Sequence, residues 1–116
     1  MNEKQSFLTA YSWFLQRITG VLLAIFLFIH IDTIHFTKKF FIDFDAVTQR
    51  LSSSGWWVVF YIFFIPLVLF HSLNGVWGIV EDYRPLPGLG KGIKAFLWVL
   101  GVIASLYGFV AITKFL

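Results

Sequence analysis

A histidine and three polar residues stand in or directly after a long apolar run, and their types could support redox chemistry. His71 lies inside the run that starts at Leu51, and Glu81, Asp82 and Tyr83 follow at its end. On an α-helix, which turns by about 100° per residue, Asp82 returns to within about 20° of His71. An imidazole that binds a metal cofactor, with a carboxylate and a phenol below it, could deliver electrons and protons to a small substrate.

Two glycines lie between the histidine and the aspartate on the same helical strip. Gly75 and Gly78 fall at about 40° and about −20° from His71 around the helix. Because glycine has no side chain, the strip predicts a flat groove beside the imidazole, where the plane of a macrocycle could lie if the imidazole bound its iron. The alternative is that His71 hydrogen-bonds to a neighbouring helix, which the glycines merely admit. Placing an ionisable residue at membrane depth costs free energy, so His71 is a candidate functional residue.

Two further histidines, His30 and His35, flank Asp32 where the first apolar helix is expected to end. His30 adjoins a charged residue, whereas His71 lies 15 residues past Trp56, so we place His30 nearer the outer interface. At that depth His30 would not share one iron with His71, whose second axial partner would come from another chain. His30 could bind a second haem, or it could be a hydrogen-bonded interfacial histidine; His35 is expected to be interfacial only.

The opposite end of the first apolar run adds a cation to the group formed by Asp82 and Tyr83. Arg17 lies there, and an antiparallel helix pair would bring it to the same membrane face as Asp82. Reduction of a quinone needs hydrogen-bond donors for its carbonyl oxygens and groups that supply protons, which a tyrosine, an arginine and a carboxylate can provide. The alternative is an ion pair between Arg17 and Asp82 that ties two helices together, with Tyr83 as an ordinary aromatic of the membrane interface.

The elements that must position these residues are three long apolar segments. Of the 116 residues, 59% are hydrophobic and only 13% charged, more apolar surface than a soluble domain of this size can bury. Uncharged runs cover residues 18–31, 51–80 and 95–113, and a bilayer core of about 30 Å needs roughly 20 helical residues. The first run reaches that length only by extending back through Arg17 towards Tyr11. The sequence therefore predicts an all-α membrane protein with three transmembrane helices.

The connections between these helices predict an up-down-up bundle in a single domain of residues 1–116. The helices are expected at about Tyr11–Phe36, Gly55–Glu81 and Gly92–Phe115. The first connection mixes charged and aromatic residues and should lie along the membrane surface, whereas the second is short and broken by prolines. Small residues recur along one face of the third helix, where another helix could approach closely: Gly101, Ala104, Ser105, Gly108 and Ala111.

The distribution of basic residues favours a cytoplasmic N-terminus. One membrane side would hold Lys4, Arg17, Arg84, Lys91 and Lys94, and the other Lys38, Lys39, Arg50 and Lys114. The cytoplasmic side of a membrane protein carries the excess of lysine and arginine, so the larger group is assigned to it. The net charge of +3 is too small and dispersed for nucleic-acid binding, and the lack of cysteines excludes iron–sulfur ligation within this chain.

Two segments carry a resemblance to a known family. SWFLQRITG, residues 12–20, resembles the serine–arginine–glycine opening of the first helix in the membrane anchors of succinate dehydrogenase, also called succinate:quinone oxidoreductase or complex II. LFHSLNGVWGIVEDY, residues 69–83, resembles the second helix of the smaller cytochrome b subunit, with a histidine, a glycine four residues later and Asp-Tyr at its end. The three-helix layout extends the resemblance over nearly the whole chain.

The resemblance implies a role for each candidate residue. His71 would be an axial ligand of haem b, Tyr83 would bind quinone, and Asp82 and Arg17 would shape the same site. His30 fits the members that bind two haems. The implied partners are a flavoprotein subunit, an iron–sulfur subunit and a second cytochrome b anchor, whose helices would join these in a larger bundle.

In that complex, electrons from succinate would reach quinone through flavin and iron–sulfur clusters in the partner subunits, so this chain would be a non-catalytic subunit that contributes to the quinone site. Two alternatives stay open: a fumarate reductase anchor that runs the reverse reaction, and a non-redox membrane scaffold. The lack of an arginine-rich presequence leads us to expect a bacterial inner membrane.

Overall fold

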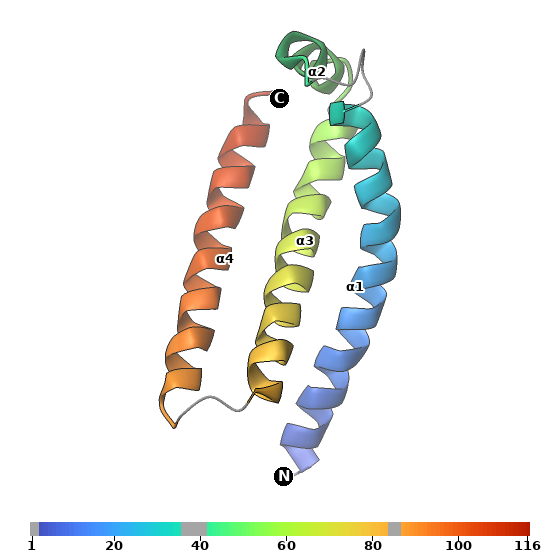
Figure 1. Ribbon diagram of the computed structural model, residues 1–116. Coiled ribbons are helices and arrows are strands. Elements are labelled where there is room, and N and C mark those ends of the chain that lie inside the picture. The colour runs from blue at the N-terminus through green and yellow to red at the C-terminus, as the bar shows by residue number, and fades with distance from the viewer. Residues whose placement is uncertain (1–2, 36–41, 84–86) are drawn as a thin grey trace.

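The computed structural model describes residues 3–35, 42–83 and 87–116. Expectations that concern Lys38, Lys39 and Arg84 lie outside the described residues, as do those for the side chains of Lys4 and His35. The described part of the chain forms four helices: α1 (Glu3–His35), α2 (Phe44–Ser52), α3 (Gly55–Asp82) and α4 (Leu89–Thr113). The three long helices run side by side in alternating directions, and the short α2 lies at one end of them (Figure 1).

The three long helices match the predicted membrane spans. Segments of 26, 28 and 25 residues in α1, α3 and α4 are long and apolar enough to cross a bilayer. The predicted all-α fold with three transmembrane helices is therefore confirmed. Helix α1 starts at Glu3 and α4 at Leu89, before the apolar runs begin. Hydrophobicity marks the part of a helix that lies in lipid, whereas backbone hydrogen bonding continues into the polar first turns.

Local capping residues explain where the later helices begin. The side chain of Asp43 accepts hydrogen bonds from the backbone N–H groups of Asp45 and Ala46 at the start of α2, and Ser54 caps α3 in the same way. These side chains satisfy N–H groups that have no partner within the first turn of a helix. Gly88, which precedes α4, has a φ of 87°, a backbone conformation that glycine adopts without steric cost.

Helix α2 was not predicted from the sequence, which indicated only a connection along the membrane surface. Its Arg50 forms an ion pair of 3.2 Å with Asp32 near the end of α1 and lies over the ring of Trp57 in α3. Leu51 on the same helix is buried. Helix α2 is thus docked against both neighbours by one buried leucine and one arginine.

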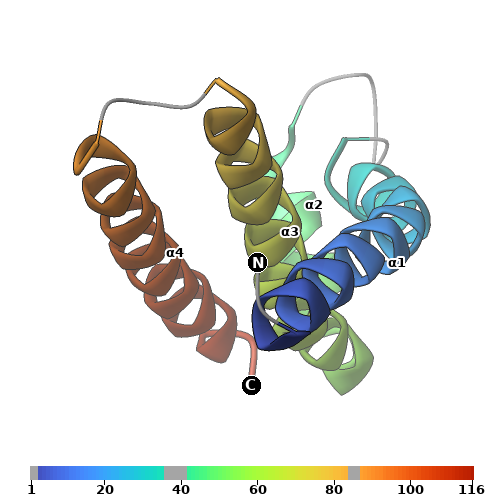
Figure 2. The same ribbon diagram turned by 90° about the horizontal axis from the view of Figure 1, so that it is seen from below.

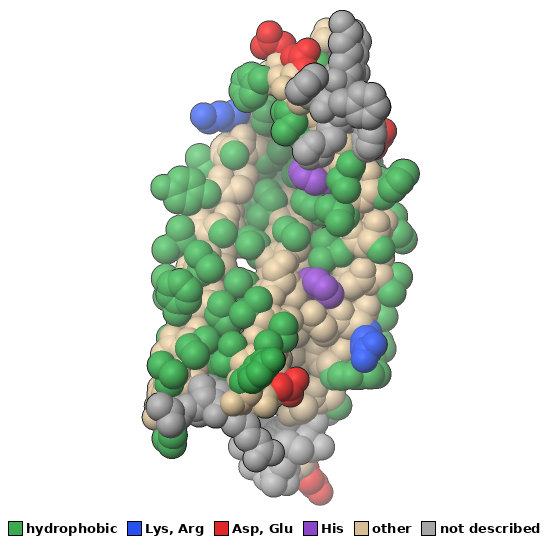
Figure 3. All heavy atoms as spheres, viewed as in Figure 1, with side chains coloured by type: hydrophobic (Ala, Val, Ile, Leu, Met, Phe, Trp, Pro, Cys, Tyr) green, Lys and Arg blue, Asp and Glu red, His purple; other side chains and the backbone are tan. Residues whose placement is uncertain are grey.

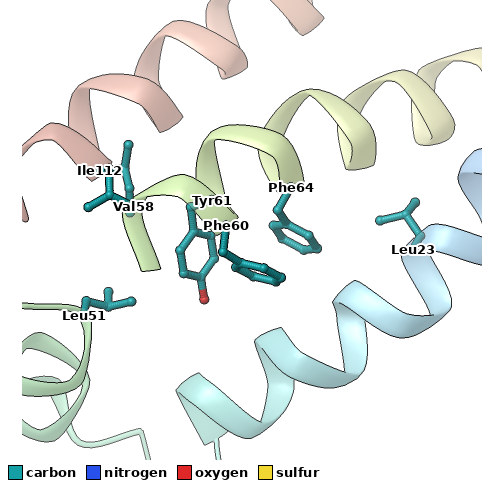
Figure 4. Close-up of a cluster of buried hydrophobic side chains, with 7 residues drawn as sticks. All are labelled: Leu23, Leu51, Val58, Phe60, Tyr61, Phe64 and Ile112. Atoms are coloured by element: carbon teal, nitrogen blue, oxygen red, sulfur yellow. The ribbon is translucent and has the colours of Figure 1, made fainter. Parts of the chain in front are cut away.

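The small hydrophobic core lies largely towards the α2 end of the bundle. Its buried side chains come from all four helices (Figure 4): Leu23, Leu51, Val58, Phe60, Tyr61, Phe64 and Ile112. Phe60 stacks on Phe64 and packs against Phe26 of α1, with ring centroids 5.7 and 5.3 Å apart. Most other large hydrophobic side chains are exposed and cover the space between the charged ends of the visible face (Figure 3), as expected for a surface in contact with lipid.

Helix α3 is the centre of the arrangement and packs against both α1 and α4 (Figure 2). The small residues of α4 face it: a methyl group added to Gly101 would meet Leu73, and one added to Gly108 would meet Ile65. The predicted close approach of another helix to this stripe is therefore made by α3. Within the described residues α1 and α4 do not pack against each other, and a groove of about 980 Å³ lies between them over α3.

Candidate functional site

His71 projects from α3 towards α1 and is half-buried between the two helices. Its Nδ1 lies 3.1 Å from the hydroxyl oxygen of Thr19, and its Cε1 lies 3.1 Å from the position that a Cβ would take on Gly20. The ring therefore rests against the backbone of α1, where a Cβ on residue 20 would be in tight contact with it. The hydrogen bond to a neighbouring helix, which the sequence offered as an alternative to iron binding, is present and engages one of the two ring nitrogens.

A ladder of polar side chains continues from His71 towards the N-terminal end of α1. Gln16 donates to the backbone carbonyl of His71 at 3.1 Å and accepts from the amide of Asn74 at 2.8 Å. Ser12 in turn donates to the side-chain oxygen of Asn74 at 3.1 Å. Each amide satisfies its partner across the helix interface, so these polar groups do not face lipid unpaired.

Sequence reasoning did not single out Gln16, Thr19 or Asn74. The signal was available, because Ser12, Gln16 and Thr19 follow one another at spacings of four and three residues and thus share a face of α1. Asn74 lies three residues after His71, on the same side of α3. A search for polar residues that share a face in each apolar run would have paired these two groups.

The sequence predicted an open groove beside the imidazole at Gly75 and Gly78, and the structure departs from this prediction at Gly75. The side-chain nitrogen of Gln16 lies 3.1 Å from the position of a Cβ on Gly75, so Gln16 occupies the space that Gly75 leaves. At Gly78 no atom of another part of the described structure lies within 4 Å of that position. The open strip thus begins at Gly78, about two turns below the histidine. The physical reason is that a long side chain from α1 fills the gap closest to the helix contact.

Two of the three predicted quinone residues, Asp82 and Tyr83, lie at the end of α3 opposite α2, whereas Arg17 lies within α1. Asp82 is exposed and shares a shallow hollow with Ile79 and Tyr83, and Tyr83 has 84% of its surface exposed. Arg17 is also exposed, and its guanidinium lies over the ring of Trp13, 5.0 Å from the centroid. The described residues contain no ion pair between Arg17 and Asp82. The structure therefore brings Asp82 and Tyr83 together and gives Arg17 a different partner, instead of the helix-tying ion pair considered as the alternative.

His30 lies in the aromatic cluster of the opposite half of the bundle. Its Nδ1 is 3.0 Å from the hydroxyl of Tyr61, and its ring stacks on Phe64 with centroids 5.0 Å apart. In the described parts of the chain, no three His, Cys, Asp or Glu side chains come together as a metal-binding cluster. An axial haem site draws only one or two side chains from the protein, so His71 and His30 must each be considered as single ligands.

Comparison with known proteins identifies the family. Residues 3–110 match the model of the succinate dehydrogenase/fumarate reductase transmembrane subunit. A curated relative, the succinate dehydrogenase hydrophobic membrane anchor subunit of Thermoplasma acidophilum, is 28% identical over 95 residues, which cover 82% of this chain and 77% of the relative. No solved structure gives a significant match. The family match extends over all three membrane-spanning helices, and the chain therefore belongs to the succinate dehydrogenase/fumarate reductase transmembrane subunit family.

Proposed function

We propose that this chain is the small cytochrome b anchor of a succinate dehydrogenase, with His71 as an axial ligand of haem b. The chain would help to bind quinone and would hold a flavoprotein subunit and an iron–sulfur subunit at the membrane. Electrons from succinate would pass through those subunits to quinone. The observation that carries the proposal is the position of the His71 imidazole, which lies inside a membrane-spanning helix and is held by α1.

The surroundings of His71 fit an axial haem ligand. A ligating histidine commonly hydrogen-bonds through its other ring nitrogen, and Thr19 lies within hydrogen-bonding distance of Nδ1. Nε2 is then the nitrogen that would bind iron, and the second anchor subunit would supply the other axial ligand. A bound haem b would supply a one-electron store within the membrane. His30, whose Nδ1 meets Tyr61, remains the candidate for a second haem.

The quinone site is proposed at the exposed end of α3. The hydroxyl of Tyr83 would donate a hydrogen bond to a quinone carbonyl oxygen, and the carboxylate of Asp82 beside it would pass protons from water. Arg17 would contribute a second donor, because it is exposed and a guanidinium that stacks on an aromatic ring still carries N–H donors in its plane. The partner subunits would complete the pocket around these three residues.

The proposed membrane orientation concerns the end of the molecule that carries Asp82 and Tyr83. The N-terminus and the α3–α4 connection lie at the end that carries Asp82 and Tyr83, while the C-terminus lies near α2 (Figure 1). We propose that this end faces the cytoplasm at a bacterial inner membrane, where the flavoprotein and iron–sulfur subunits would dock. The family description covers fumarate reductase as well, and the direction of the physiological reaction is decided by comparing succinate oxidation with fumarate reduction in the purified complex.

The test of haem ligation is His71→Ala, measured in the complex purified with its partner subunits. Loss of this axial ligand should lower the haem content per flavin and weaken the b-type α band in the dithionite-reduced spectrum. Ser72→Ala, at the exposed neighbouring position, is the matched control and should keep wild-type haem content. If the wild-type complex shows no b-type band although its partners are present, the non-redox scaffold replaces this proposal.

A further inference from the structure

The hydroxyl of Thr19 lies close to three potential hydrogen-bond partners but has only one hydrogen to donate. Its oxygen lies 2.7 Å from the carbonyl oxygen of Leu15, 3.2 Å from that of Gln16 and 3.1 Å from Nδ1 of His71. Thr19 is buried, with 7% of its surface exposed. A threonine hydroxyl carries one hydrogen to donate and two lone pairs to accept, so the neighbours compete for a single proton.

The distances decide where that proton goes. Carbonyl oxygens can only accept, and the 2.7 Å contact to Leu15 is the shortest of the three, so the hydroxyl donates to Leu15. If the hydroxyl donated to His71 instead, two oxygens with lone pairs would face each other at 2.7 Å with no hydrogen between them. The contact at Nδ1 must then run the other way, with the imidazole as donor and Thr19 as acceptor.

The direction of this hydrogen bond determines which tautomer His71 adopts. We infer that Thr19 is a positioning residue that holds His71 in the neutral form protonated on Nδ1, which leaves the lone pair of Nε2 for an iron atom. The inference rests on the proposed haem ligation. Within the described residues Thr19 is the one hydrogen-bond partner of the His71 ring, because Gln16 donates to the backbone carbonyl of His71 and not to its ring.

The fold supports this role before any haem is present. The neighbouring Gly20 lets the ring lie against α1, and the hydrogen bond from Gln16 fixes the backbone of His71 relative to the same helix. The ring plane and the tautomer are therefore determined by one segment of α1. Such outer contacts also raise the basicity of the ligand, and their loss typically weakens metal binding about 10–100-fold.

The experiment compares three variants with the wild type. Thr19→Val removes the hydroxyl at nearly constant volume, and Thr19→Ser restores it. Thr33→Val is the matched control, because Thr33 also lies on α1, is buried, and donates to the carbonyl of the fourth preceding residue at 2.8 Å, but has no hydrogen bond to a histidine side chain among those that the structure describes.

The first readout does not depend on haem. Solid-state ¹⁵N NMR of the full chain in lipid bilayers, with labelled histidine and the His71 signals assigned from His71→Gln, reports which ring nitrogen carries the proton. We expect Nδ1–H in the wild type, Thr19→Ser and Thr33→Val, and a shift towards Nε2–H in Thr19→Val. A wild-type ring protonated on Nε2, or a tautomer unchanged in Thr19→Val, overturns the inference.

The second readout uses the purified complex with haem bound. Transfer of haem to excess apomyoglobin should be about 10–100-fold faster for Thr19→Val and close to wild type for Thr19→Ser and Thr33→Val. A changed tautomer with unchanged haem retention would overturn the positioning role. A wild-type complex without haem would instead refute the proposed function, while the NMR result still decides whether Thr19 sets the tautomer.

Discussion

At the scale of single residues, two neighbouring residues of α1 determine how the imidazole of His71 lies in the candidate site. Thr19 meets Nδ1, and Gly20 leaves the space in which Cε1 lies. The two residues are adjacent, so the hydrogen bond and the missing side chain act on the same edge of the ring. In a membrane helix interface such a contact fixes the position of the ring more than it adds stability, because interhelical hydrogen bonds there contribute little.

Gly20→Ala tests the steric half of this contact. The new methyl group would lie 3.1 Å from Cε1 of His71, so the ring or α1 must shift, and overpacking of this kind costs about 1–3 kcal/mol. We expect a lower haem content per flavin in the purified complex. Gly92→Ala is the control, since nothing lies within 4 Å of its Cβ position. Unchanged haem content in Gly20→Ala would mean that the ring position does not matter for ligation.

Tyr83→Phe tests the proposed quinone contact. The substitution removes only the hydroxyl of a side chain that is 84% exposed, and one lost hydrogen bond of about 1 kcal/mol should slow quinone reduction roughly fivefold. Succinate-dependent reduction of a dye by the partner subunits should be preserved. Tyr107→Phe removes an exposed hydroxyl from α4 and should leave both activities unchanged. An equal loss of both activities in Tyr83→Phe would point to a folding defect instead.

At the scale of helices, packing is uneven along the bundle. Towards α2 the helices are joined by aromatic stacking, and towards the other end by the ladder of Ser12, Gln16 and Asn74. Hydrogen bonds between membrane helices contribute about 0.6 kcal/mol each, so the ladder sets the rotation of α1 against α3 more than it adds stability. The short α2 depends on its contacts with the long helices, because nine residues are too few for a stable isolated helix.

Helix α2 is docked by one buried contact and one exposed contact, and the two can be tested separately. Leu51→Ala removes a side chain that is 6% exposed and should destabilise the docked helix by about 2 kcal/mol or more. Asp32→Asn breaks the ion pair with Arg50, but both side chains are at least one-third exposed, so its cost should stay below about 1 kcal/mol. Hydrogen–deuterium exchange of the α2 amides measures both. Faster exchange in Asp32→Asn than in Leu51→Ala would reverse this order.

At the scale of the whole molecule, the three long helices form an incomplete bundle. The longest dimension is 51 Å, enough to cross a bilayer core of about 30 Å with both ends outside it. Because α1 and α4 do not pack against each other in the described structure, the faces of α3 between them remain open, and a second anchor subunit would complete the helical layer. The single chain therefore supplies one wall of the proposed haem site and not the whole of it.

The orientation of this layer in the membrane can be tested by cysteine labelling, since the natural chain contains no cysteine. Ser53→Cys and Pro87→Cys place exposed thiols at opposite ends. With a cytoplasmic N-terminus, a membrane-impermeant maleimide should label Ser53→Cys in intact cells, and Pro87→Cys only after permeabilisation and denaturation. The wild type should remain unlabelled. The reverse pattern would place the N-terminus outside.

The amino-acid sequence by itself determined the number of membrane spans, the helical class and the family motif around His71. These features depend on local composition and on spacing along one helix, which tertiary contacts do not alter. Only the tertiary structure decided that Gln16 fills the space beside Gly75, that Thr19 meets His71, and that Arg17 stacks on Trp13. The physical reason is that these helices are apolar on nearly every face, so hydrophobicity does not specify how each is rotated about its axis. That rotation is set by side-chain packing and by the few hydrogen bonds between α1 and α3.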